Sequence, residues 1–193
     1  MDMRALAMLA LISMTSLAAG RLVEGSAASP VRVLVYEDLQ CPDCSQFRMM
    51  LDVHLLPKYK DKVGFEHRDF PLPKHSWARK AAIAARFFES VKPELGVEFR
   101  RVTMAKLASI APEAFDAHVA SFAKANGVEP AKAAAGLTDP RFAKLVDSDY
   151  EEGVARGVAK TPTVFVEGEP FIETFTVTEL SKAIDAALGS AKN

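Results

Sequence analysis

The chain has 193 residues, 49% of them hydrophobic, so it can bury a core of ordinary size and has room for one domain with an inserted lobe. Its formal net charge is −1 and it has no long run of Lys and Arg, which argues against a nucleic-acid partner. Beyond the N-terminal region, no hydrophobic stretch is long enough to span a bilayer.

The N-terminal residues follow the order of a secretory signal peptide. Arg4 supplies positive charge, residues 5–12 form an apolar stretch, and small residues follow at positions 18–20. The apolar stretch is shorter than the roughly 20 residues that a membrane-spanning helix needs, and hydroxyl side chains interrupt its continuation.

Two interpretations of this segment are open. One is a buried N-terminal helix, which Asp2 favours because an acidic residue weakens the positive charge of a signal peptide. We predict the other, a signal peptide over residues 1–28 with cleavage between positions 19 and 28. The protein is then periplasmic or secreted, in an oxidising compartment of the cell envelope where disulfide chemistry is favoured.

A strand and a helix are predicted around a pair of cysteines. Residues 31–36 are rich in β-branched and apolar types, as in a strand that is covered on both faces. Pro42 suits the first turn of a helix, and apolar side chains recur at helical spacing over residues 45–59. We expect Pro57 to kink or end this helix. A second strand over residues 63–70 completes a β-α-β unit.

Cys41 and Cys44 are the only cysteines, and one helical turn brings their sulfur atoms to the same face. A disulfide that closes so short a loop removes little entropy from the unfolded chain, so a structural role is poorly motivated. There are two alternatives: the thiols supply two of the ligands of a metal site, or they are chemically inert. Zinc sites need four ligands, and the histidines lack the spacing of a zinc-binding pair. They are His54, His67, His75 and His118. We favour redox chemistry.

A helical region and a second mixed region follow. From residue 77 to residue 157 alanines are frequent and apolar residues lie three and four apart, and Pro and Gly divide this pattern into four or five short helices. Residues 163–167 and 170–174 are then predicted to form a β-hairpin. A last helix begins near Thr176, which forms a capping box with Glu179.

The predicted order is therefore β-α-β over residues 30–76, a helical insertion over residues 77–157, and β-β-α over residues 158–193. Three stretches accompany this order: YEDLQCPDC, RDFPLPKHSWARKAA and GVAKTPTVFVEG. Together they resemble the DsbA-like thiol-disulfide oxidoreductases, which belong to the thioredoxin superfamily. The resemblance implies an α/β fold of the thioredoxin type with an inserted helical domain.

The two cysteines differ in their expected roles. Cys41 lies at a helix N-terminus, where free amides and the positive end of the helix dipole lower a thiol pKa, so we expect it to be the exposed nucleophile. Cys44 lies one turn inside the helix and is expected to resolve the mixed disulfide. Both are catalytic residues and together form the redox-active disulfide.

The substrate site follows from the resemblance, which implies that Pro162 is a cis proline beside the disulfide. Thr161 would then offer backbone hydrogen bonds to a substrate segment that lies across the motif as an added strand. Pro42 and Asp43, inside the motif, are included in the predicted substrate-binding set. The alternative for Pro162 is an ordinary proline at a strand edge.

Two positions depart from the family pattern. Asp43 stands where strongly oxidising relatives have histidine, and its negative charge stabilises the Cys41 thiolate less than an imidazolium would. We therefore predict that the protein is less oxidising than those relatives. Val35 stands where many relatives carry a buried acid that takes the proton of the resolving thiol. Glu37 or Asp38 could substitute, or both could be solvated carboxylates at the strand end.

Two further residues have open roles. His75 falls in a stretch that resembles a family pattern, and a hydrogen-bonded structural role is the simpler interpretation. Lys160 stands before Thr161-Pro162, where many relatives have glycine, and it changes the charge of the predicted groove.

The sequence thus predicts a periplasmic or secreted protein disulfide oxidoreductase that exchanges disulfides with exported proteins through Cys41 and Cys44. A membrane reoxidase or reductase is the expected partner, and no cofactor, metal or nucleic acid is expected. We expect a monomer, because few residues separate the predicted cleavage site from the first predicted strand. The alternatives are a disulfide reductase or isomerase, a dithiol carrier of copper(I) or zinc, and an interaction platform with incidental cysteines.

Overall fold

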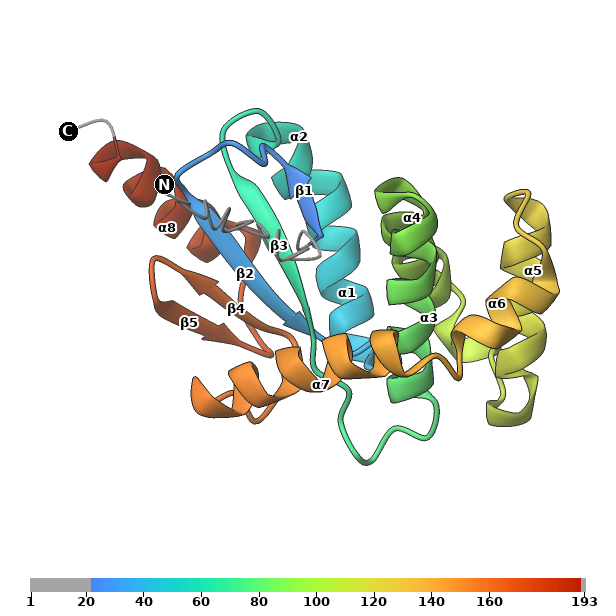
Figure 1. The fold of residues 1–193 in the computed structure, drawn as a ribbon. Coiled ribbons are helices and arrows are strands. Elements are labelled where there is room, and N and C mark those ends of the chain that lie inside the picture. Colours follow the sequence, from blue (N-terminus) through green and yellow to red (C-terminus); the bar gives the residue numbers. More distant parts are fainter. Residues whose placement is uncertain (1–21, 192–193) are drawn as a thin grey trace, which may run out of the picture.

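The computed structural model describes residues 22–191 (Figure 1). These residues form the strands β1 (Val23–Gly25), β2 (Arg32–Glu37), β3 (Gly64–Asp69), β4 (Thr163–Val166) and β5 (Glu169–Ile172). Their α-helices are α1 (Pro42–Met50), α2 (Leu56–Tyr59), α3 (Ala78–Val91), α4 (Pro93–Ala105), α5 (Phe115–Ala125), α6 (Pro130–Gly136), α7 (Pro140–Ala155) and α8 (Val177–Ser190). A π-helical turn, η1 (Leu51–Leu55), and two 3₁₀ turns, η2 (Leu107–Ser109) and η3 (Pro112–Ala114), complete the set.

The strands form one mixed sheet in the order β1-β3-β2-β4-β5. β2 and β3 are parallel, and every other pair is antiparallel. The register places Glu37 beside Asp69, so the two parallel strands end together. This architecture confirms the predicted α/β class, with a β-α-β unit, a helical insertion and a β-β-α unit in chain order.

Helices cover both faces of the sheet (Figure 1). On one face, α1 and α8 bury an aliphatic and aromatic core against β2, β3 and β4. On the other face, α7 packs over Tyr36 and Phe70 through Tyr150 and Gly153. A side chain at Gly153 would collide with the Phe70 ring, so this glycine allows α7 to approach the sheet closely.

The helix that carries the cysteine motif is distorted before Pro57. α1 changes into the π-helical turn Leu51–Leu55, and α2 then continues to Tyr59. Because proline lacks an N–H and its ring displaces the preceding turn, a local change of hydrogen bonding is the expected result. A local change of hydrogen bonding is thus present before Pro57, and the helix does not end there.

The helical insertion contains α3 to α7 and has its own aromatic core. Phe88 contacts Phe99 and Phe122 at ring-centroid distances of 4.9 and 4.8 Å, and Trp77 stacks on Phe115 at 5.0 Å. The same cluster of buried residues includes both cysteines. The lobe therefore packs directly against the end of the sheet that carries the motif.

Buried ion pairs tie this lobe to the sheet. Arg100 of α4 donates from Nη1 to Glu37 Oε1 over 3.0 Å, and its Nη2 lies 2.8 Å from Asp69 Oδ1. Arg86 of α3 donates from Nε to Asp69 Oδ2 over 2.5 Å and also pairs with Asp149 of α7. Arg100, Glu37 and Asp69 are almost inaccessible to solvent. Two carboxylates at the ends of β2 and β3 thus bind arginines from the lobe.

A buried histidine extends this network to the first strand. His67 of β3 bonds through Nδ1 to Glu37 Oε1 at 3.0 Å and through Nε2 to Glu24 Oε1 at 2.8 Å. Burial disfavours the charged ring, but Glu37 and Glu24 outweigh burial and raise the pKa of His67 to about 9. Glu24 also pairs with Arg48 of α1. β1 is therefore held by charge as well as by its pairing with β3.

The sequence did not predict β1, which lies inside the range given for signal-peptide cleavage. Residues 1–21, which hold most of the predicted signal, lie outside the described part of the chain. Within residues 22–191, no helix combines the length and the hydropathy that crossing a membrane requires.

We predict that the stabilising effect of His67 depends on pH. The pKa of His67 is higher in the folded protein than its ordinary value near 6.5, so its contribution is complete below that value and is lost as pH rises through about 9. Relative to His67→Gln, the wild type should lose about 3 kcal/mol of unfolding free energy between pH 6 and pH 10. Urea unfolding at several pH values measures this difference, and a constant difference would contradict the prediction.

Candidate active site

The two cysteines lie where the first long helix begins. Cys41 is the N-cap residue of α1 and has an extended backbone, Pro42 is the first helical residue, and Cys44 lies one turn inside. The Cys41 carbonyl accepts the first helical hydrogen bond, from Ser45 N–H over 3.1 Å. Both sulfur atoms are free thiols, so the structure represents the reduced form.

Cys41 is less accessible than the sequence predicted. Its residue exposure is 4%, and that of Cys44 is 0%, so the expectation of an exposed nucleophile is wrong. The helical lobe is the reason, because Cys41 joins the apolar cluster that contains Leu39 and Trp77. The small exposed part of Cys41 opens into a surface hollow.

The two thiols have opposite pKa shifts. A hydrogen bond from the Cys44 thiol lowers the pKa of Cys41 to about 6, against the effect of burial. The backbone N–H groups of Cys44 and Asp43 also stabilise the Cys41 thiolate. Burial raises the pKa of Cys44 well above its ordinary value, and the Cys41 sulfur adds to this shift. At neutral pH Cys41 is mostly thiolate and Cys44 is a thiol.

A segment far away in the sequence faces Cys41. When Cys41 is protonated, its thiol donates to the carbonyl oxygen of Thr161, which lies 3.3 Å from Sγ. The Thr161–Pro162 peptide bond is cis, as the family resemblance implied. Both residues are buried and lead directly into β4. Pairing of β4 with β2 therefore brings Thr161 to the motif.

The hollow beside Cys41 has a volume of about 550 Å³. Its lining comes from the motif, from the segment before α3 and from the segments on both sides of the cis peptide bond. The lining residues are Cys41, Asp43, Leu72, Pro73, Lys74, Ala159, Lys160, Thr161 and Glu173. Of the four predicted substrate-binding residues, Asp43 and Thr161 line the hollow, whereas the exposed Pro42 and the buried Pro162 lie next to it.

Asp38 is a buried hydrogen-bond acceptor and not a solvated carboxylate. Its exposure is 1%, and Oδ2 accepts from the Leu72 N–H and from His75 Nδ1, both over 2.7 Å. Oδ1 accepts from the Gln40 N–H, also over 2.7 Å, and the Asp38 N–H donates to Cys44 Sγ over 3.4 Å. His75 has the hydrogen-bonded role that the sequence favoured.

Glu37 is buried as well, so the interpretation of both acids as solvated carboxylates is wrong. The sequence could not reveal this, because their partners are far away in the chain. Burial raises the pKa of Glu37, but His67 and Arg100 outweigh it and lower the pKa below its ordinary value. Glu37 is thus a charged member of the buried network. Its use in proton transfer stays a prediction.

Charged side chains surround the mouth of the hollow. Lys160 donates to Glu173 Oε2 over 2.7 Å, so its charge is largely balanced. The exposed side chains of Lys74 and Asp43 have no ion-pair partner within residues 22–191. Four lining residues were not predicted from the sequence: Leu72, Pro73, Lys74 and Glu173. The first three lie in the RDFPLPKHSWARKAA stretch.

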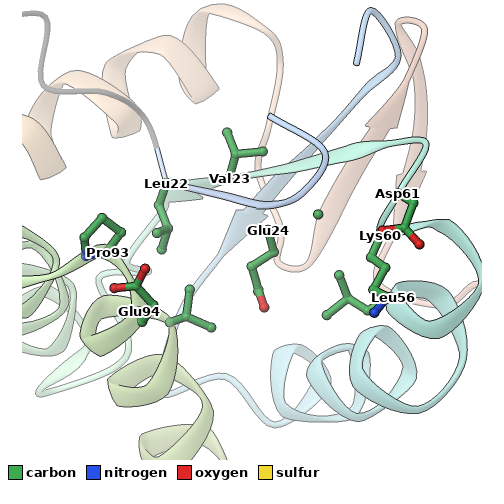
Figure 2. A pocket seen from close by; sticks show the side chains of 10 residues that line it. Leu22, Val23, Glu24, Leu56, Lys60, Asp61, Pro93 and Glu94 are labelled. Atoms are coloured by element: carbon green, nitrogen blue, oxygen red, sulfur yellow. The ribbon is translucent and has the colours of Figure 1, made fainter. Parts of the chain in front are cut away.

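No metal site accompanies the thiols in the described part of the chain, where no three His, Cys, Asp or Glu residues are grouped to hold an ion. A second hollow, with a volume of about 420 Å³, lies between β1 and the start of α4. Figure 2 shows the side chains that line it. The half-buried carboxylate in its lining, Glu24, is already paired with Arg48 and His67. None of the motif residues lines this hollow, which therefore lies outside the active site.

A family model and several solved structures match the chain. The family model described as thioredoxin matches residues 18–186. The oxidised BdbD of Bacillus subtilis has a TM-score of 0.79 and 22% sequence identity, over 89% of this chain and 94% of that chain. The thiol-disulfide exchange protein alpha-DsbA2 of Wolbachia pipientis has a TM-score of 0.74 and 17% identity, over 86% of each chain. These structures share the fold.

A further similarity is to part of a much longer protein. The chain is 28% identical over 173 residues to the Na(+)/H(+) antiporter NhaA 3 of Salinispora tropica. The match covers 88% of this chain and 25% of that protein, so the chain spans a quarter of the length of this relative.

We predict that the low pKa of Cys41 depends on the Cys44 thiol. Cys44→Ala removes the donor of the hydrogen bond that contributes most to the shift, so the pKa of Cys41 should rise from about 6 by about 1 unit. Cys44→Ser keeps a donor and should leave the pKa closer to the wild-type value. Thiolate absorbance or the rate of alkylation, followed against pH, measures both. Equal pKa values in the wild type and the alanine variant would contradict this.

Proposed function

We propose that this chain, which belongs to the thioredoxin family, is a protein disulfide oxidoreductase of the DsbA type. In this proposal Cys41 is the nucleophile and Cys44 is the resolving thiol. Exported proteins with cysteine thiols are the substrates, and the protein acts in the periplasm or outside the cell.

One observation carries the proposal. A thiolate with a pKa of about 6 lies against a buried thiol of much higher pKa, at the floor of a hollow that a cis-proline segment borders. Such a pair can form a disulfide, and the thiolate is a good leaving group because its charge is stabilised. An inert pair of thiols would need neither the difference between their pKa values nor the hollow that connects Cys41 to solvent.

The reaction runs through a mixed disulfide. In the oxidised protein, a substrate thiolate attacks Cys41 Sγ, the Cys41–Cys44 bond breaks, and Cys44 leaves and takes up a proton. A second substrate thiolate then attacks the substrate sulfur atom of the mixed disulfide. The substrate disulfide forms, and Cys41 leaves as the thiolate. The substrate loses two electrons and the protein gains them.

Substrate binding is proposed to use the backbone of Thr161. An extended segment that pairs with Thr161 would place its sulfur atom near Cys41, because the Thr161 carbonyl already lies 3.3 Å from Cys41 Sγ. Asp43 borders the same hollow and would contact residues that flank the substrate cysteine. For the next cycle Cys41 would attack a disulfide of a redox partner in the membrane, and Cys44 would resolve the mixed disulfide, which restores the Cys41–Cys44 bond and leaves the partner reduced.

Two other functions differ in what they require. A reductase or isomerase would use the same residues, with Cys41 kept reduced. A dithiol carrier would bind copper(I) or zinc, and the two thiols would need ligands from outside the described residues. The stabilised Cys41 thiolate favours the oxidase, because it makes reduction of the disulfide more favourable.

The proposed function is tested by refolding. The oxidised protein is added to a reduced, unfolded substrate that needs a disulfide for activity. The wild type should restore substrate activity, and Cys41→Ser should not, because it cannot form the active-site disulfide. Cys44→Ser, given the oxidised substrate instead, should accumulate the mixed disulfide, because its Cys41 thiolate attacks the substrate disulfide and no resolving thiol is left. Equal refolding with wild type and Cys41→Ser would overturn the proposal. Tight stoichiometric retention of copper(I) or zinc without any disulfide exchange would favour the carrier.

We predict that Asp43→His makes the protein more oxidising. An imidazolium beside Cys41 stabilises the thiolate, whereas the exposed Asp43 carboxylate in the same hollow does not. The equilibrium with glutathione should shift toward the reduced protein by about tenfold, which corresponds to about 30 mV. Asp43→Asn is the matched control and should shift it less. An unchanged or less oxidising histidine variant would refute the prediction.

A further inference from the structure

Asp38 lies between the resolving thiol and one wall of the hollow. Its backbone N–H donates to Cys44 Sγ, while its carboxylate holds Leu72 and His75, which are 34 and 37 residues farther along the chain. Leu72, together with Pro73 and Lys74, lines the same hollow as the Thr161 segment. One residue thus contacts the redox pair and also binds the wall.

The wall segment has few other fixed points. The His75 N–H donates to the Leu72 carbonyl over 3.0 Å, which closes the segment into a turn. The Trp77 N–H donates to Gln40 Oε1 over 2.7 Å, where the segment enters α3. The Gln40 N–H in turn donates to Asp38. The Gln40 side chain, which also donates from Nε2 to Ser76 Oγ over 3.4 Å, thus holds the end of the wall segment, while the Asp38 carboxylate holds Leu72 and His75.

The hydrogen bonds of Asp38 explain why a carboxylate can be buried there. Both oxygen atoms accept, from two backbone N–H groups and one imidazole nitrogen, at 2.7 Å in each case. Hydrogen bonds to a charged acceptor are worth about twice those between neutral groups. These contacts suit a positioning role, because each of them fixes a group of the wall segment or of the segment before the motif.

We propose that Asp38 is a positioning residue that fixes Leu72–Pro73–Lys74 as the second wall of the substrate groove, of which the Thr161 segment is the first. The inference rests on the proposed function, because it assigns to that reaction a residue that determines how a peptide binds. A peptide that spans the hollow touches both walls, whereas a small dithiol reaches Cys41 without the second wall. Replacing Asp38 should thus slow disulfide exchange with a peptide more than exchange with a small dithiol.

The test compares two reductants of the oxidised protein, a two-cysteine peptide of about ten residues and dithiothreitol. Asp38→Asn keeps the shape of the side chain but replaces one acceptor oxygen by an NH₂ group. This group then faces an N–H donor of the protein, so at least one of the three hydrogen bonds is lost. For the peptide we expect kcat/KM to fall about tenfold, mostly through KM, because a displacement of about 1 Å can cost up to 100-fold. For dithiothreitol the rate should change less than twofold. Hydrogen exchange of the Leu72 amide should accelerate about tenfold.

Asp139→Asn is the matched control. Asp139 also accepts from the amide two residues farther along, that of Arg141 over 2.9 Å, but it lies at the start of α7 outside the hollow. This variant should leave both rates unchanged. If Asp38→Asn does not fold, His75→Ala tests the same wall, with about a threefold loss for the peptide. His75→Gln can still donate and should recover most of that loss.

The outcomes separate the two proposals. Equal losses with peptide and dithiothreitol would overturn the positioning role and would place Asp38 in the chemistry of the thiols. An unchanged peptide rate with unchanged Leu72 exchange would overturn it as well. A wild-type protein that oxidises neither reductant would refute the proposed function, while exchange at the Leu72 amide would still report whether Asp38 holds the wall.

Discussion

The ion pairs at the ends of β2 and β3 are the interaction on which the rest of the structure depends. Glu37 and Asp69 end adjacent parallel strands, and Arg100 bridges them from the helical lobe. Removing charged groups from water is costly, so such a network is retained only when each charge finds its partners, and those partners define one docking position. The lobe therefore meets the sheet in one orientation, beside the cysteine motif.

The active site uses this orientation, because it is assembled from three parts of the chain. The thioredoxin-like first half supplies the cysteines, the segment before α3 supplies one wall, and the segment before β4 supplies the other. The Ser45 hydroxyl donates to the Met104 carbonyl over 3.0 Å and joins the motif helix directly to α4. The buried Cys44 and the nearly buried Cys41 follow from this contact, since apolar residues of the lobe complete their surroundings.

Local patterns were sufficient for most of the fold. The β-branched run before the motif, the alanine-rich helical spacing and the capping box at Thr176 each act through neighbours in sequence, and each is present. β1 could not be predicted in this way, because three residues are too few to show a period and its pairing with β3 is distant in sequence. The burial of Glu37 and Asp38 was missed for the same reason, since an acidic pair at a strand end has the same sequence pattern whether it faces water or arginine.

β1 also has a consequence for how far the chain can be shortened from its N-terminus. Glu24 on this short strand supplies a carboxylate to both His67 and Arg48, which are themselves buried. A polypeptide that started at residue 26 would keep the cysteine motif, both walls of the hollow and the lobe. It would also leave an imidazolium and a guanidinium in the interior with one counter-charge fewer. The Glu24 carboxylate on this edge strand thus acts as a counterion inside the protein. A recombinant version is best begun before the strand.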